Sequence, residues 1–234
     1  MPRRPSPLGP LLLPFAVLAA LAAPACLGSR AGYERASRTA DRTATYREHL
    51  VRLRDQLGLT AEALGTLRAS PDVLPRSNRE TFQTFARELT NLDSAVERTR
   101  KDYGRMDEGA LIFFGGWVSD TAAIQDADLK KRAEERRIAL QANYQKVAQG
   151  HGELDAALTR HLRELEDLRV YLETDLTPAG ITSVDDRIAR ALAVSSELQE
   201  RVSDQAHATD AAQSGLTPLQ AQAPSQELLE ARVR

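Results

Sequence analysis

Apolar side chains recur at alternating intervals of three and four residues through most of this chain. An α-helix turns once in 3.6 residues, so this spacing places them along one side of a helix. A helix with such a stripe must pack against other helices to remove it from water. The pattern predicts an all-α protein. The most regular stripe consists of Phe82, Phe85, Leu89, Leu92, Val96, Thr99, Tyr103, Met106, Ala110, Phe113 and Trp117.

Four segments carry this periodicity, and residues typical of helix ends bound each of them. Ser70-Pro71 ends the first segment, Ser77 and Glu80 have the spacing of a capping box, and a turn is expected at Thr177-Pro178-Ala179-Gly180. Helices of about 46 residues would be ~70 Å long, which favours an elongated antiparallel helical bundle. The domain is expected at 26–212, with helices at about 31–68, 78–124, 128–173 and 183–212.

The turn between the second and third helices has two candidate positions. Gly115-Gly116 interrupts the stripe, whereas Ile124 continues it in register. We expect the turn near Gln125 to Asp128, where Asp126 would cap the third helix. A turn at the glycine pair is the alternative.

The two ends of the chain differ from the helical segments. Residues 1–25 have the features of a signal peptide: Arg3 and Arg4, an apolar run over 11–23, and the small residues of Ala23-Pro24-Ala25. The apolar run is too short for a comfortable membrane span of ~20 residues. After about Ala212 the composition shifts to Gln, Ser, Gly and Pro, which predicts a disordered tail over 213–234.

Cys26 is the only cysteine and directly follows the expected cleavage site. The segment resembles a bacterial lipobox, in which the cysteine sulfur accepts diacylglycerol and the cysteine becomes the mature N-terminus. Ala23 stands where leucine is common in that motif. We expect lipidation of Cys26 and a periplasmic protein anchored by lipid to a membrane, the outer membrane being the candidate. The alternative is ordinary secretion with a free thiol.

Common catalytic patterns are absent from the sequence. It has no Gly-x-Ser-x-Gly elbow, phosphate-binding glycine loop, Cys-x-x-Cys or Glu-x-x-His. We therefore expect no enzyme activity and no cofactor. A formal net charge of -2 gives no reason to expect nucleic-acid binding.

The histidines are the candidates for a hidden site. His151 and His161 both lie on the stripe of the third helix, but ten residues place them ~15 Å apart, whereas paired helical ligands need spacings of three or four. We expect core histidines and no metal. A metal- or ligand-binding bundle that uses these histidines is the alternative function. His49, beside the stripe of the first helix, is expected to be solvated.

Two groups flank the expected turn between the second and third helices. Phe113-Phe114 and Trp117 place apolar side chains on more than one face of the helix. We expect them to pack in the core; the alternative is an exposed apolar tip that mediates oligomerisation or membrane contact. Basic residues follow the turn, with Glu134 and Glu135 among them, so a mixed-charge surface is expected rather than a lipid- or partner-binding patch. The basic residues are Lys130, Lys131, Arg132, Arg136 and Arg137.

A resemblance to a known family covers about residues 33–210. It is carried by Phe113-Phe114 to Trp117, Asp120, Ile124, Asp126, Leu129, Lys130, Tyr144, and the Tyr171-Leu172 segment that ends in Leu176. The chain resembles a bacterial family of exported, lipoprotein-like, coiled-coil proteins known as a domain of unknown function. The resemblance implies an envelope location and no catalytic residues. We predict a non-catalytic periplasmic or membrane-tethered protein that acts on unknown protein partners in the cell envelope.

Overall fold

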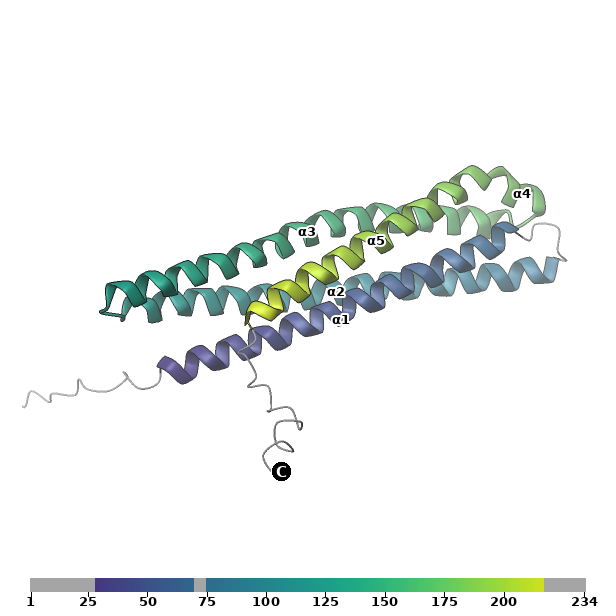
Figure 1. The fold of residues 1–234 in the computed structure, drawn as a ribbon. Coiled ribbons are helices and arrows are strands. Elements are labelled where there is room, and N and C mark those ends of the chain that lie inside the picture. The colour runs from purple at the N-terminus through teal and green to yellow at the C-terminus, as the bar shows by residue number, and fades with distance from the viewer. Residues whose placement is uncertain (1–27, 70–74, 217–234) are drawn as a thin grey trace, which may run out of the picture.

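Four long helices form the protein, and each packs against two of the others. The computed structural model describes residues 28–69 and 75–216, which contain helices and no strand. α1 packs on α2 and α5, and α3 packs on the same two helices, so the four close into an antiparallel bundle (Figure 1). The all-α elongated bundle is thus confirmed. The helices are α1 (Gly28–Ala69), α2 (Pro75–Ala122), α3 (Ala127–Thr174), α4 (Pro178–Ser183) and α5 (Asp185–Leu216).

The helix bounds differ from the expected ones in three places. α2 begins at Pro75, so Ser77 lies inside the helix and the predicted capping box is wrong; a proline is tolerated in the first turn because its missing N–H has no helical partner there. The expected turn at 177–180 contains the start of the short helix α4, which Thr177 caps by accepting from the Gly180 amide at 3.0 Å. α5 continues through 213–216, which the sequence assigned to the tail.

The turn between α2 and α3 occupies residues 123–126, close to the expected position. Asp126 caps α3, as predicted, by accepting a hydrogen bond from the Leu129 amide at 2.8 Å. The alternative position of the turn, at the glycine pair, is wrong, because Gly115 and Gly116 lie inside α2.

Gly116 has another role: a Cβ on it would lie 2.6 Å from the Arg35 Nε atom. Its missing side chain lets the Arg35 guanidinium lie across α2.

The core follows the predicted stripes. Most of the α2 stripe is buried, with Leu92 and Met106 fully inaccessible, whereas Phe82, Tyr103 and Trp117 are only partly covered. Burial of one leucine side chain contributes roughly 1.5–3 kcal/mol, so several dozen such groups supply the main driving force for assembly. The buried set includes leucines of α1 and α3 and the Ile188, Leu198 and Val202 side chains of α5.

Polar contacts at seven-residue intervals join α1 to α2. Arg35 pairs with Asp120 at 2.5 Å, Arg42 donates to the Arg105 carbonyl oxygen at 3.0 Å, and His49 Nδ1 lies 2.5 Å from Asp102. These contacts fit only one antiparallel register of the two helices. The prediction that His49 is solvated is wrong, because the buried Asp102 carboxylate on α2 covers it.

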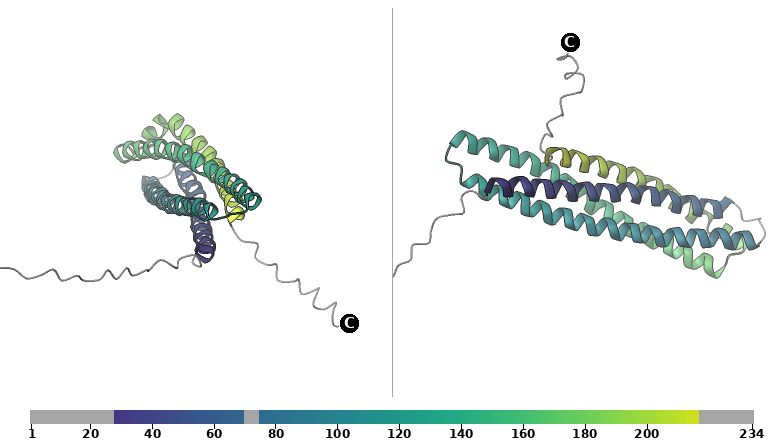
Figure 2. Two further views of the ribbon diagram at one scale, coloured as in Figure 1. Left: turned by 90° about the vertical axis from the view of Figure 1, so that its left-hand side faces the viewer. Right: turned by 90° about the horizontal axis from the view of Figure 1, so that it is seen from below.

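One end of the rod has three helices instead of four. α5 ends at Leu216, short of the turn between α2 and α3 (Figures 1 and 2). A Cβ on Gly215 would lie 2.3 Å from Leu140 Cδ2, so the last turn of α5 lies against α3 near residue 140. Residues 127–139 of α3 therefore extend beyond α5. We call residues 111–140, the last turns of α2, the turn and the first turns of α3, the hairpin end.

Replacing Leu92 with Asp should unfold the bundle. Its side chain is fully buried in the α2 stripe, and an unpaired buried charge costs several kcal/mol, on the order of the whole stability of a domain. Circular dichroism with thermal melting measures the effect. Ser94→Asp is the matched control, because it adds the same charge at an exposed position two residues away. Retained helicity and an unchanged Tm in Leu92→Asp would mean that the stripe does not face a core.

Candidate functional site

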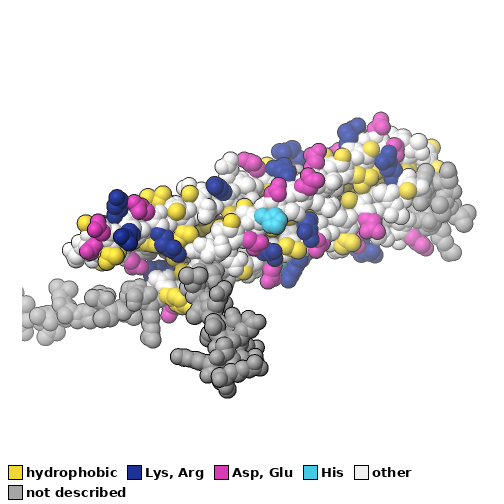
Figure 3. Space-filling view, viewed as in Figure 1, with side chains coloured by type: hydrophobic (Ala, Val, Ile, Leu, Met, Phe, Trp, Pro, Cys, Tyr) yellow, Lys and Arg dark blue, Asp and Glu magenta, His cyan; other side chains and the backbone are white. Residues whose placement is uncertain are grey.

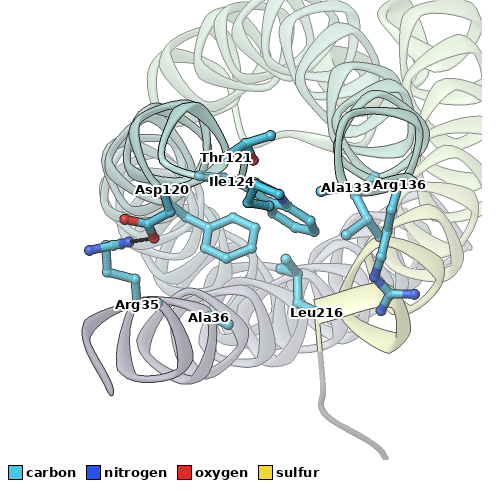
Figure 4. Close-up of a pocket in the computed structure, with 13 residues that line it drawn as sticks. Arg35, Ala36, Asp120, Thr121, Ile124, Ala133, Arg136 and Leu216 are labelled. Atoms are coloured by element: carbon cyan, nitrogen blue, oxygen red, sulfur yellow. Dashed lines mark hydrogen bonds and ion pairs between the residues drawn. The ribbon is translucent and has the colours of Figure 1, made fainter. Parts of the chain in front are cut away.

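A pocket of about 380 Å³ opens at the hairpin end, beside the last turn of α5. This volume lies within the range of about 300–1,000 Å³ found for small-ligand sites. Side chains of all four long helices point into the space (Figure 4). Most of them are apolar, and the charged groups are Arg35, Asp120 and Arg136. The lining residues are Gly32, Arg35, Ala36, Phe113, Trp117, Asp120, Thr121, Ile124, Ala133, Arg136, Leu140, Gly215 and Leu216.

The two arginines of the pocket have different surroundings. Arg35 is held by Asp120, and its buried Nε atom has no hydrogen-bond acceptor among the described residues. Arg136 stands on the opposite side of the pocket, near the end of α5 (Figure 4). It is exposed, and within residues 28–69 and 75–216 it forms no ion pair. The pocket therefore has a neutralised pair on one side and a free positive charge on the other.

Large apolar side chains are exposed around this pocket. Of the nine that are exposed in the described chain, six belong to the hairpin end or the start of α1. Figure 3 shows hydrophobic, basic and acidic side chains mixed at this end of the visible face. Phe113 and Phe114 are buried, as predicted, whereas Trp117 is partly exposed and lines the pocket. The six exposed side chains are Tyr33, Leu111, Ile112, Val118, Leu129 and Ile138.

A layer of polar and aromatic groups crosses the middle of the bundle. Each long helix contributes one member: Tyr46, Tyr103, His151 and Gln205. The His151 ring stacks on Tyr103 with centroids 3.6 Å apart, and its Nδ1 lies 3.0 Å from the Tyr46 hydroxyl. The Gln205 amide donates to that hydroxyl at 3.3 Å and to the Val147 carbonyl oxygen at 2.8 Å. The layer links all four helices at one level.

The ionisable groups of this layer are neutral at pH 7. The Tyr46 hydroxyl accepts from Gln205 and shares a second hydrogen bond with His151 Nδ1, in which the histidine tautomer decides which group donates. Burial lowers the pKa of His151 and raises that of Tyr46, and both shifts keep the two groups neutral at pH 7. Two neutral, buried groups that satisfy each other's hydrogen bonds are typical of a structural contact.

His161 forms a second, separate polar contact in the core. Its Nε2 atom lies 2.9 Å from the Ser195 hydroxyl on α5, and its Nδ1 atom has no partner within the described residues. The residue is 2% exposed, and burial lowers its pKa to about 4. His161 is therefore neutral at pH 7.

The predicted site residues are not brought together. His151 contacts Tyr46 and Tyr103, His161 contacts Ser195, and His49 pairs with Asp102. Within the part of the chain that the structure describes, no three His, Cys, Asp or Glu side chains converge as a metal site would require. Cys26, the expected lipidation site, and the signal peptide over 1–25 lie outside the described residues.

Sequence reasoning missed the partners of the two core histidines. Ser195 and Gln205 both lie on the buried face of α5, together with Leu198 and Val202. The available signal was the series of three- and four-residue steps continuing through Gln205 to Thr209 and Ala212, all buried. A polar residue on such a series, opposite a histidine of another helix, indicates a buried hydrogen bond.

Comparison of the chain with protein families, curated proteins and solved structures found no match. The resemblance to an exported domain of unknown function thus stays a prediction. In the described residues, no helix combines the length and apolar character that crossing a membrane requires.

Gly150→Ala should destabilise the protein while Gly152→Ala does not. A Cβ on Gly150 would lie 2.3 Å from Gln205 Oε1, whereas nothing lies within 4 Å of one on Gly152. Displacing Gln205 breaks its two buried hydrogen bonds, at a cost of about 1–3 kcal/mol. An alanine at 152 should instead stabilise the helix by up to ~1 kcal/mol. Urea unfolding measures both changes, and equal effects would contradict the Gln205 contact.

Stability should fall as the pH drops from 7 to 5. The unfolded His161 titrates near its ordinary pKa of 6.5 and the folded one near 4, so only the unfolded state takes up a proton between these values. The contribution of His161 to the free energy of unfolding is fully present above pH 6.5. By linkage, about 2 kcal/mol of it is lost by pH 5. The lowered pKa of His151 acts in the same direction.

The matched variant combines His161→Leu with Ser195→Ala and removes both partners of one buried contact. Urea unfolding at pH 7 and pH 5 should show that the free energy of unfolding falls less in this variant than in the parent. This comparison does not depend on the absolute stability of the variant. The same loss in both proteins would mean that His161 titrates normally in the folded state.

Proposed function

We propose that this chain is a non-catalytic, membrane-tethered protein of the cell envelope that binds a protein partner through its hairpin end. The observation that carries the proposal is the concentration of exposed apolar side chains at the end where the fourth helix is missing. Exposed apolar surface in a folded protein is typical of interaction sites.

The composition of the hairpin end supports a protein partner. Leu111 and Val118 on α2, with Leu129 and Ile138 on α3, leave apolar side chains exposed on both helices of the hairpin end. Basic side chains lie among them on the first turns of α3. A partner segment with apolar anchors and flanking acidic groups fits this mixture, because apolar contacts supply affinity and charges set orientation and association rate.

The position of the expected tether supports an interaction close to the membrane. Cys26 precedes the start of α1 by two residues, and Arg35 on α1 pairs with Asp120 at the hairpin end. The lipid on Cys26 and the hairpin end would then belong to the same end of the rod. A partner in the membrane or at its surface would meet this end first.

The state of the acidic groups supports a role without catalysis. Asp102, the one buried carboxylate of the described chain, is held between His49 and Arg105. Asp155 is held by Arg100, and Asp185 accepts hydrogen bonds from the Nε and Nη2 atoms of Arg68. The Arg68 guanidinium lowers the pKa of Asp185. Carboxylates held by basic partners in this way differ from the desolvated, unpaired acids that general acid catalysis uses.

A photo-crosslinking amino acid at Ile138 should capture a discrete protein in living cells, whereas the same group at Val170 should not. Both positions are exposed on α3, at 58% and 49%, but Val170 lies toward the other end of the rod. Ile138→Glu should remove the product formed from a crosslinker at Val118. Equal products from positions 138 and 170 would contradict a binding surface at the hairpin end.

Cys26→Ser separates the tether from the interaction. In the parent, membrane fractionation should recover the protein with membranes and the mass of the N-terminal peptide should include a diacylglycerol. The variant should move to the soluble fraction and lose most of the crosslink at position 138. An N-terminus without lipid in the parent would show that the tether is wrong, while the crosslink at 138 would still test the binding surface.

A further inference from the structure

We propose that the pocket at the hairpin end binds a single-chain amphiphile with a carboxylate head group. The alkyl chain would lie among Phe113, Trp117 and Leu140, and the head group would lie at Arg136. This inference goes beyond the proposed function, because it concerns a small ligand inside the pocket and not a protein on the outer surface.

The size of the pocket favours a thin, flexible ligand over a helix. One turn of helix with side chains is a cylinder ~10 Å wide and ~5.4 Å long, or roughly 400 Å³. The pocket of about 380 Å³ therefore has room for one turn of helix at most. A saturated chain of about ten carbons fits, since a methylene occupies roughly the volume of a water molecule, ~30 Å³.

The lining separates an apolar interior from a charged edge. Ala36, Ile124, Ala133 and Leu216 complete an apolar wall contributed by α1, α2, α3 and α5. The Arg35–Asp120 pair satisfies its own charge on one side. An alkyl chain has no polar atoms to satisfy and can displace water from such a wall, so each methylene that is buried there favours binding.

The charge at the opposite side determines the head group. Arg136 has no carboxylate partner among the described residues, and its guanidinium can donate two parallel hydrogen bonds to a carboxylate. The surrounding stretch 128–137 carries five basic and three acidic residues, so its field also attracts an anion. A cationic head group would meet repulsion at the same place.

The sole tryptophan of the chain reports on this pocket directly. Trp117 lines it, so its fluorescence responds to occupancy without a label. The experiment uses residues 26–234 with Cys26→Ser, which retain the whole bundle and have no acyl group of their own. Decanoate, added below its micelle concentration, should shift the Trp117 emission to shorter wavelength with saturation. Decyltrimethylammonium, with the same chain and the opposite charge, should produce no saturable shift.

Two arginine variants separate the head-group contact from general electrostatics. Arg136→Gln should weaken decanoate binding about tenfold, the size of one charge-assisted hydrogen bond. Arg132→Gln removes the same charge from the same cluster but does not line the pocket, and should change binding less than twofold. Ala133→Phe should fill the pocket and abolish the shift, with the melting temperature serving as the check on folding.

Three results would overturn the proposal. One is the absence of a saturable shift with decanoate in a folded parent protein. Another is equal weakening by Arg132→Gln and Arg136→Gln, which would indicate nonspecific attraction. The third is a red shift of Trp117 without ligand, together with tighter decanoate binding, when residues 217–234 are deleted. That result would assign the pocket to the chain's own C-terminal segment.

Discussion

The burial of one apolar stripe per helix is the constraint on which the rest of this structure depends. None of the long helices can hide its stripe alone, so α1, α2, α3 and α5 must close around a common core. The closure has a consequence at the hairpin end, where α5 stops at Leu216 and the stripes of α2 and α3 continue. The pocket forms there, between Trp117 of α2 and the last turn of α5 at Leu216. The candidate site is thus a product of unequal helix lengths in an otherwise regular bundle.

Polar groups inside the bundle determine which of many similar packings is adopted. Leucine stripes alone would permit helices to slide by one heptad with little loss of burial, whereas a buried hydrogen bond is satisfied in one register only. The contact between Gln205 and Tyr46 and that between His161 and Ser195 align α5 with α1 and α3. Gly150 allows the first contact, because any larger residue would occupy the place of the Gln205 amide. The histidines that suggested metal chemistry therefore have a specific structural explanation.

The sequence predicted the helices well because their signal is periodic and local. The positions of the stripes, the turn near Asp126 and the burial of Phe113 were all expected from spacing alone. The pairing of His49 with Asp102 was not, because it depends on which helices become neighbours and in which register. The pocket was also missed, since a cavity depends on where α5 ends relative to α3, and the composition near Ala212 suggested an earlier end than Leu216. The sequence pattern therefore predicts which face of each helix is buried, whereas the partners of individual side chains follow only from the three-dimensional packing.

Hydrogen exchange measured by mass spectrometry tests most directly whether the fourth helix is missing from one end. Amides of α3 between residues 144 and 172, which are covered by α5, should exchange slowly and together, near the rate of global unfolding. Amides between 127 and 139 should exchange markedly faster, because three helices protect them less than four. Equal protection along the whole of α3 would contradict an open end, and with it the pocket and the binding surface assigned to it.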